Sequence, residues 1–130
     1  MGKTYTIHIE ETGKSRPRPH EIEAAQKIAS QLKSSLIFLR RESSKSPDLY
    51  ILKTNTRWEL KSPTGGSKHT IQNNLRNADD QSENVILDLS VSKFSDEKGI
   101  SRAKEFMKHE RSKIKKLKVL LKSGELVDIK

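Results

Sequence analysis

Apolar residues recur along this chain at two spacings, every second position and every third or fourth position. The first spacing is typical of a strand with one buried face, and the second is typical of a helix with one buried face. The pattern predicts strands at 3–10, 35–39 and 84–89, hairpins at 48–61 and 117–129, and helices at 21–32, 68–82 and 96–111. Taken in chain order, these elements predict an α/β fold, with a mixed central β-sheet flanked by helices.

The predicted hairpin at 48–61 combines a buried face with an unusual polar face. Its apolar set is Leu49, Ile51, Trp58 and Leu60. With Thr54-Asn55 as a two-residue turn, Lys53 pairs with Thr56 and Asp48 lies across from Lys61. Side chains alternate between the two faces of a strand, so the polar face carries Asp48, Tyr50, Glu59 and Lys61. A slip of one residue would turn one strand over and separate these groups.

Two carboxylates and an ammonium on one small patch are suited to phosphodiester hydrolysis. Carboxylate oxygens bind hard divalent cations, Mg²⁺ first, with Mn²⁺ or Zn²⁺ as alternatives. The lysine would position or activate the attacking water, or stabilise charge that develops on the phosphate. The spacing alone favours an ordinary exposed hairpin face that carries a cross-strand ion pair, because this pattern of residues often occurs by chance.

The composition indicates a basic protein of one domain, residues 1–130. The formal net charge is +9, which favours an anionic partner such as nucleic acid. Basic residues are densest between 102 and 118, where Lys113, Lys115 and Lys116 are candidates for phosphate contacts. Cysteine is absent, so disulfides and thiolate metal sites are excluded. No apolar run reaches membrane-spanning length, and no membrane anchoring is expected.

Two helix starts carry further candidates. Glu21 lies on the same predicted helix face as Ala25, Ile28 and Leu32. A carboxylate there either binds a metal or interacts favourably with the helix N-terminus. The glycine-rich entrance at 65–69 includes Lys68 and His69 and is able to approach a phosphate through backbone amides, or it is a plain loop before a helix.

The motif Pro47-Asp48, a ten-residue gap and Glu59-Leu60-Lys61 resembles the PD-(D/E)xK nuclease superfamily. The longer run ELKSPTGGSKHTIQNNLRNADDQS, together with PHEIEAAQKIA upstream, resembles the C-terminal tRNA nuclease toxin domains of contact-dependent growth inhibition proteins. The resemblance covers about the middle half of the chain. It implies that Asp48, Glu59 and Glu21 bind the metal and that Lys61 is the catalytic lysine. It also implies that a polar helix faces the active site, with Thr70, Asn74 and Gln81 on it, and Arg76 is a further candidate for nucleic-acid binding.

The resemblance leads us to expect a metal-dependent endoribonuclease that cleaves tRNA. It also implies delivery by a secreted or surface protein into the cytoplasm of a target bacterium, and a cognate immunity protein. The basic charge predicts that this immunity protein is acidic. A DNA endonuclease of the same fold and a non-catalytic basic RNA-binding protein are the alternatives. A binding module has no need for carboxylates that repel phosphate, and no DNA-reading motif is recognisable, which favours the RNA nuclease.

Overall fold

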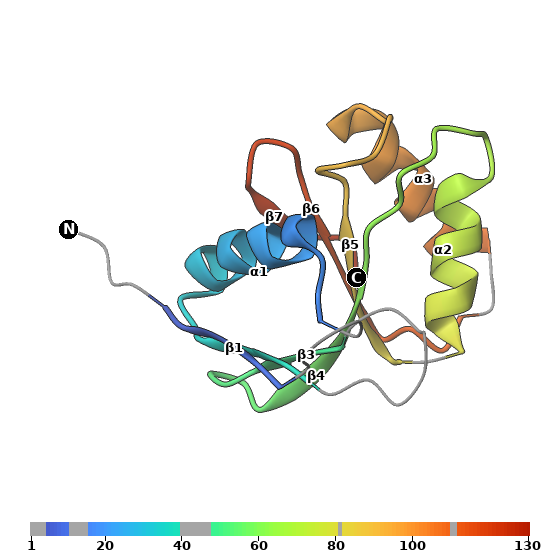
Figure 1. Ribbon diagram of the computed structural model, residues 1–130. Coiled ribbons are helices and arrows are strands. Elements are labelled where there is room, and N and C mark those ends of the chain that lie inside the picture. Colours follow the sequence, from blue (N-terminus) through green and yellow to red (C-terminus); the bar gives the residue numbers. More distant parts are fainter. Residues whose placement is uncertain (1–4, 11–15, 40–47, 81, 110–111) are drawn as a thin grey trace.

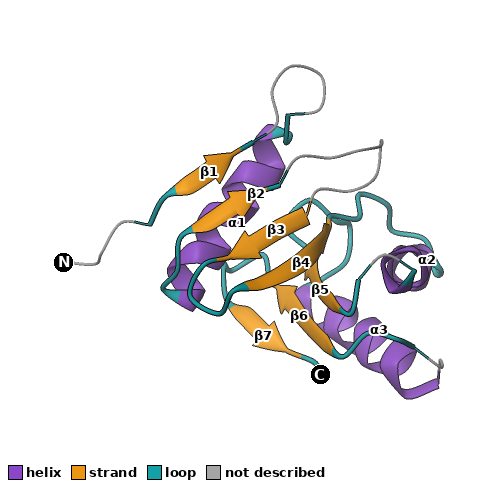
Figure 2. Ribbon diagram, turned by 90° about the horizontal axis from the view of Figure 1, so that it is seen from below, coloured by secondary structure: helices purple, strands orange, loops and turns teal. Residues whose placement is uncertain are grey.

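Seven strands of the described chain lie side by side in a single sheet, in the order in which they occur in the sequence (Figure 2). The computed structural model describes residues 5–10, 16–39, 48–80, 82–109 and 112–130. The strands are β1 (Ile7–Ile9), β2 (Leu36–Phe38), β3 (Asp48–Ile51), β4 (Thr56–Lys61), β5 (Asn84–Asp88), β6 (Lys116–Leu120) and β7 (Leu126–Asp128). Strands β1, β2, β4, β5 and β6 run in one direction, and β3 and β7 run in the other.

Helices cover both faces of this sheet, and α1 is separate from the other two (Figure 1). Helix α1 (Pro19–Leu32) packs with Trp58, Leu60 and Ile86 in one buried cluster. Helices α2 (Thr70–Asp79) and α3 (Asp96–His109) pack with Val85 and Leu87 in another. Because neighbouring residues of β5 point to opposite faces, the two clusters form two cores on either side of the sheet.

The predicted fold class and the order of elements are confirmed. The structure is a mixed α/β sheet flanked by helices. Two residues of the motifs, Pro47 and Gln81, lie outside the described residues. Within the described parts of the chain, no helix has both the length and the apolar character needed to cross a membrane.

The turn of the β3–β4 hairpin differs from the prediction. Ile51 pairs with Thr56, so four residues form the loop instead of two. Asn55 ends the loop with a φ of 52°, a left-handed conformation that asparagine adopts more readily than most residues. The longer loop shifts the register by two residues. A shift of two keeps every side chain on its predicted face, because the side-chain period of a strand is also two.

Candidate active site

The β3–β4 hairpin places Asp48 directly opposite Glu59. The predicted pairing of Asp48 with Lys61 is therefore wrong, and the four-residue loop is the reason. Lys61 lies instead next to Glu59 on the same face of the same strand, with its Nζ 3.8 Å from Oε1 of Glu59. The structure thus brings Asp48, Glu59 and Lys61 together. The cross-strand pair is Asp48 with Glu59, in place of the predicted Asp48 with Lys61.

Glu59 is buried and has an unsatisfied oxygen. Its relative exposure is 2%, and its Oε1 atom has no hydrogen-bond partner in the described protein. The pKa of the Glu59 carboxyl is raised from about 4.5 to about 9, first by burial and then by the hydrogen bond to Asp48 and the charge of Asp48. Lys61 and Arg57 act in the opposite direction. At neutral pH Glu59 therefore holds a proton.

Arg57 is a member of this site that the sequence analysis missed. Its Nε donates a hydrogen bond of 2.8 Å to Oδ2 of Asp48, and its Nη2 contacts the same oxygen. The Arg57 side chain is mostly exposed, so the ion pair is a surface interaction that solvent screens. Arg57 precedes Glu59 by two positions, and the same alternation that placed Glu59 and Lys61 on one face would have found it.

These residues fit a divalent cation. Magnesium is commonly held by one or two carboxylates, with water and phosphate oxygens completing its shell. Asp48 and Glu59 supply the carboxylates, and the unsatisfied Oε1 of Glu59 is an available ligand atom. Binding there requires Glu59 to lose its proton, which a cation favours by direct electrostatic attraction.

Glu21 is not gathered into this pair. Across the described segments, no group of three or more His, Asp or Glu side chains is arranged to hold a metal ion. The Glu21 carboxylate accepts a hydrogen bond of 2.8 Å from the backbone N–H of Arg18, in a capping arrangement at the start of α1. Helix α1 also packs on the face that carries Trp58 and Leu60, whereas Glu59 points to the other face. Of its two predicted roles, Glu21 thus has the one at the N-terminus of the helix. The predicted group of three carboxylates, Glu21, Asp48 and Glu59, is not formed.

Asp88 supports the strand end beside Lys61, and the sequence analysis did not single it out. It ends β5, which is the parallel neighbour of β4, and it is fully buried. Its carboxylate accepts hydrogen bonds from Oγ of Ser62 at 3.0 Å and from the backbone N–H of Ser90 at 2.9 Å. Because Ser62 follows Lys61 directly, this buried network restrains the end of β4 that carries the lysine.

The glycine-rich loop before α2 contacts the first residue of α2 and the segment between β5 and α3. The backbone N–H of Ser67 donates to Oγ1 of Thr70 at 3.1 Å, so this amide is already satisfied. Lys93 lies in the segment between β5 and α3. A Cβ atom on Gly66 would lie 2.8 Å from Cβ of Lys93, so the glycine allows the loop to approach this segment closely. Lys68 and His69 are exposed beside this loop.

The polar residues of α2 split between local structure and the outer surface. Asn74 donates a hydrogen bond of 2.9 Å from Nδ2 to the backbone oxygen of Thr70. His69 Nδ1 lies 3.1 Å from Oε1 of Gln72. Arg76 lies on the exposed side of the helix. Thr70 and Asn74 thus stabilise the first turn of α2, and their predicted contact with nucleic acid stays a prediction.

The basic residues at 113–116 do not join the carboxylate site. Lys113 and Lys115 lie in the segment before β6, and Nζ of Lys115 is 3.5 Å from Oε1 of Glu83. Lys116 begins β6 opposite Asn84, near the start of the parallel strands, whereas Lys61 ends β4. The predicted phosphate contacts of Lys113, Lys115 and Lys116 stay a prediction.

Comparisons with known proteins add two matches. The profile described as contact-dependent growth inhibition CdiA C-terminal domain matches residues 45–126, which is more than half of the chain. No curated protein sequence matches the chain. Among solved structures, a chain of the CdiA-CT/CdiI toxin and immunity complex from Burkholderia pseudomallei has a TM-score of 0.60 and 16% identity, over 95% of this chain and 98% of that chain. At this level of identity the structural match shows a shared fold.

Proposed function

This chain belongs to the family of contact-dependent growth inhibition CdiA C-terminal domains, and on that premise we propose that it is a toxin domain that cleaves tRNA by metal-dependent phosphodiester hydrolysis. The observation that carries the proposal is the buried, unsatisfied Oε1 of Glu59, a residue that pairs with Asp48 across the strands and has the Lys61 ammonium 3.8 Å away. An orphaned carboxyl oxygen in a buried site is costly unless a ligand completes it. The assignment to the PD-(D/E)xK superfamily is part of the proposal.

In this proposal Asp48 and Glu59 hold Mg²⁺, with Mn²⁺ or Zn²⁺ as alternatives. When bound, the cation would polarise the phosphate and acidify a coordinated water. The residues around Glu59 must favour loss of its proton. The Lys61 ammonium 3.8 Å away and the nearby guanidinium of Arg57 both favour the charged carboxylate, so they assist the loss of its proton.

Lys61 is the residue that we assign to the substrate. Its relative exposure is 8%, so its ammonium is held in place by the surrounding protein. A fixed positive charge next to the scissile phosphate stabilises the charge that develops on its oxygens in the transition state. The Asp88–Ser62 hydrogen bond keeps the strand end that carries Lys61 in position.

Exposed residues next to the carboxylate site would bind the RNA backbone. Lys68 and His69 follow β4 by one loop, and Arg76 lies on the outer side of α2. Their contacts would be to phosphate, which positions a strand without reading its sequence. Recognition of a folded tRNA by shape requires no sequence-reading motif.

The test of this function compares RNA and DNA substrates. Purified protein is incubated with total tRNA and, separately, with plasmid, each with Mg²⁺ or with EDTA, and Glu59→Gln serves as the matched inactive variant. The proposal expects discrete tRNA fragments that depend on Mg²⁺ and on Glu59. Plasmid cleavage with intact tRNA would point to a DNA endonuclease, and binding of RNA without cleavage would point to an RNA-binding protein.

The proposed function includes delivery and a protective partner. A domain of this family would be carried by a secreted or surface protein into the cytoplasm of a target bacterium. A cell that makes it needs a cognate immunity protein, and a net charge of +9 favours an acidic one through steering and complementary contacts. Such a protein would cover Lys61, Lys68 and His69 or the basic face of α3. If the wild-type domain is made alone at high yield without a growth defect, the toxin and immunity proposal fails.

A further inference from the structure

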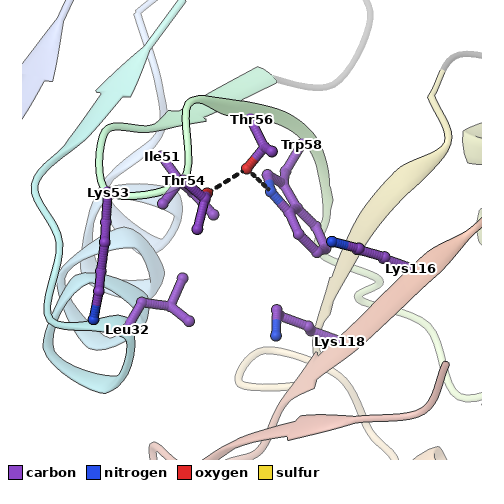
Figure 3. Close-up of a pocket in the computed structure, with 8 residues that line it drawn as sticks. All are labelled: Leu32, Ile51, Lys53, Thr54, Thr56, Trp58, Lys116 and Lys118. Atoms are coloured by element: carbon purple, nitrogen blue, oxygen red, sulfur yellow. Dashed lines mark hydrogen bonds between the residues drawn. The ribbon is translucent and has the colours of Figure 1, made fainter.

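A cavity of about 220 Å³ lies on the face of β4 opposite Glu59, between the end of α1, the β3–β4 loop and the start of β6. Figure 3 shows the residues that line it. They are Leu32, Ile51, Lys53, Thr54, Thr56, Trp58, Lys116 and Lys118. Its inner part is apolar, because Ile51 and Trp58 are almost fully buried, while Lys53, Thr54 and Lys116 are exposed at the rim.

The rim carries uncompensated positive charge. Nζ of Lys118 contacts Oδ1 of Asp128 at 2.6 Å and lies 5.6 Å from the centroid of the Trp58 ring. Within the described chain, the ammonium groups of Lys53 and Lys116 have no ion-pair or hydrogen-bond partner. Two available cations at the mouth of an apolar cavity attract a ligand that joins an anionic group to a flat apolar body.

Two threonines define which anionic ligand fits best. Trp58 Nε1 donates to Oγ1 of Thr56 at 2.8 Å, and the Oγ1 atoms of Thr54 and Thr56 are 2.6 Å apart (Figure 3). Each hydroxyl has one donor and two acceptor sites. Whichever threonine donates to the other, the pair keeps one O–H donor and further acceptor sites. A nucleobase edge offers both donors and acceptors, whereas the carboxylate of an acidic peptide only accepts hydrogen bonds.

We propose that this cavity binds one unstacked nucleotide of a nucleic-acid strand, with the base inside near Trp58 and the flanking phosphates on Lys53 and Lys116. The size agrees with this ligand, since sites for drug-sized molecules usually measure about 300–1,000 Å³ and a single base is smaller. Proteins that hold single strands combine phosphate contacts along a basic groove with contacts of the bases to aromatic and apolar side chains. The site would be a second nucleic-acid contact, on the opposite face of the sheet from the carboxylates.

This inference rests on the proposed function only in taking nucleic acid as the ligand, and its test requires no cleavage. Trp58 lines the cavity and is the one tryptophan of the chain, so tryptophan fluorescence reports on its surroundings, and the variants below locate the binding. Ribonucleoside 5′-monophosphates and a short single-stranded RNA are titrated in EDTA, with ribose 5-phosphate and a glutamate-rich peptide as comparisons. We expect saturable changes for the nucleotides and the RNA, and binding at least about tenfold weaker for the comparisons.

Three variants locate the binding. Lys53→Gln with Lys116→Gln should weaken RNA binding about tenfold or more and reduce its salt slope by about 1.4, at about 0.7 per phosphate contact. Lys98→Gln, an exposed lysine on α3, should match the wild type. Leu32→Phe should fill the cavity and remove the response while the lysines remain, with folding checked by circular dichroism.

Four results would overturn the proposal. They are no saturable change with any nucleotide or RNA, equal binding of ribose 5-phosphate, equal binding of the acidic peptide, and wild-type affinity in the double lysine variant. The test with the double lysine variant does not depend on whether Leu32→Phe folds. If the fluorescence responds as expected but tRNA stays intact in Mg²⁺, the nuclease proposal fails and the nucleotide site remains.

Discussion

Asp48 and Glu59 are direct partners across β3 and β4, and their side chains are hydrogen-bonded to each other. The negative charge of one carboxyl group opposes ionisation of its neighbour, and burial of Glu59 opposes it further. The metal-free protein responds by keeping Glu59 protonated, and this links the proposed chemistry to pH.

Glu59→Gln is expected to abolish metal binding and cleavage while leaving the fold intact. Glutamine has the shape of the protonated glutamic acid that the protein holds at neutral pH, so the change in the free energy of unfolding should stay below about 1 kcal/mol at pH 7. Calorimetric titration with Mg²⁺ and gel assays of tRNA measure both effects. Cleavage at the wild-type rate would remove Glu59 from the active site.

The stability of the metal-free protein should fall as pH rises. A folded-state pKa near 9 lies above the unfolded value near 4.5, so the folded state binds more protons between these values. The contribution of Glu59 is fully present below about pH 4.5 and is lost as the pH rises toward 9. Denaturant unfolding in EDTA at several pH values should show this slope in the wild type and a smaller slope in Glu59→Gln.

Metal binding should strengthen over the same pH range. Because Mg²⁺ must displace the proton of Glu59, its affinity should rise by up to about tenfold per pH unit below pH 9. Calorimetry in buffers of different ionisation enthalpy counts the protons released. Release of no proton near pH 7 would contradict the protonated state of Glu59.

Lys61→Ala is expected to lose cleavage by about a hundredfold or more and to keep metal binding within about tenfold of the wild type. The reason is that Lys61 is assigned to the phosphate and only assists the ionisation of Glu59. Lys98→Ala, on the exposed surface of α3, serves as the control. If Lys61→Ala cleaves at the wild-type rate, the positive charge that stabilises the transition state comes from another residue.

Asp88→Ala should destabilise the protein by about 2–4 kcal/mol and also reduce cleavage. It leaves the Ser62 hydroxyl and the Ser90 amide without their buried acceptor. Asp128→Ala removes an exposed partner of Lys118 and should cost less than about 1 kcal/mol. Equal losses in the free energy of unfolding would show that the buried Asp88 network stabilises the protein no more than an exposed ion pair does.

The sequence by itself determined which face each residue of the hairpin occupies. Alternation along a strand is a local property, so Asp48, Glu59 and Lys61 were grouped correctly even though the turn was predicted with two residues instead of four. The fold class followed from the same local periodicities, since each apolar stripe must be buried against another element.

The tertiary structure alone decided which of these groups are partners. The cross-strand register depends on the conformation of the loop, and Asn55 in its left-handed conformation sets a register that alternation cannot distinguish from the predicted one. Burial of Glu59 depends on the sheet and helices that surround it, so its raised pKa has no signal in the local sequence. The cavity beside Trp58 joins α1, the β3–β4 loop and β6, segments that are far apart in the chain, and only the packing of the sheet brings them together.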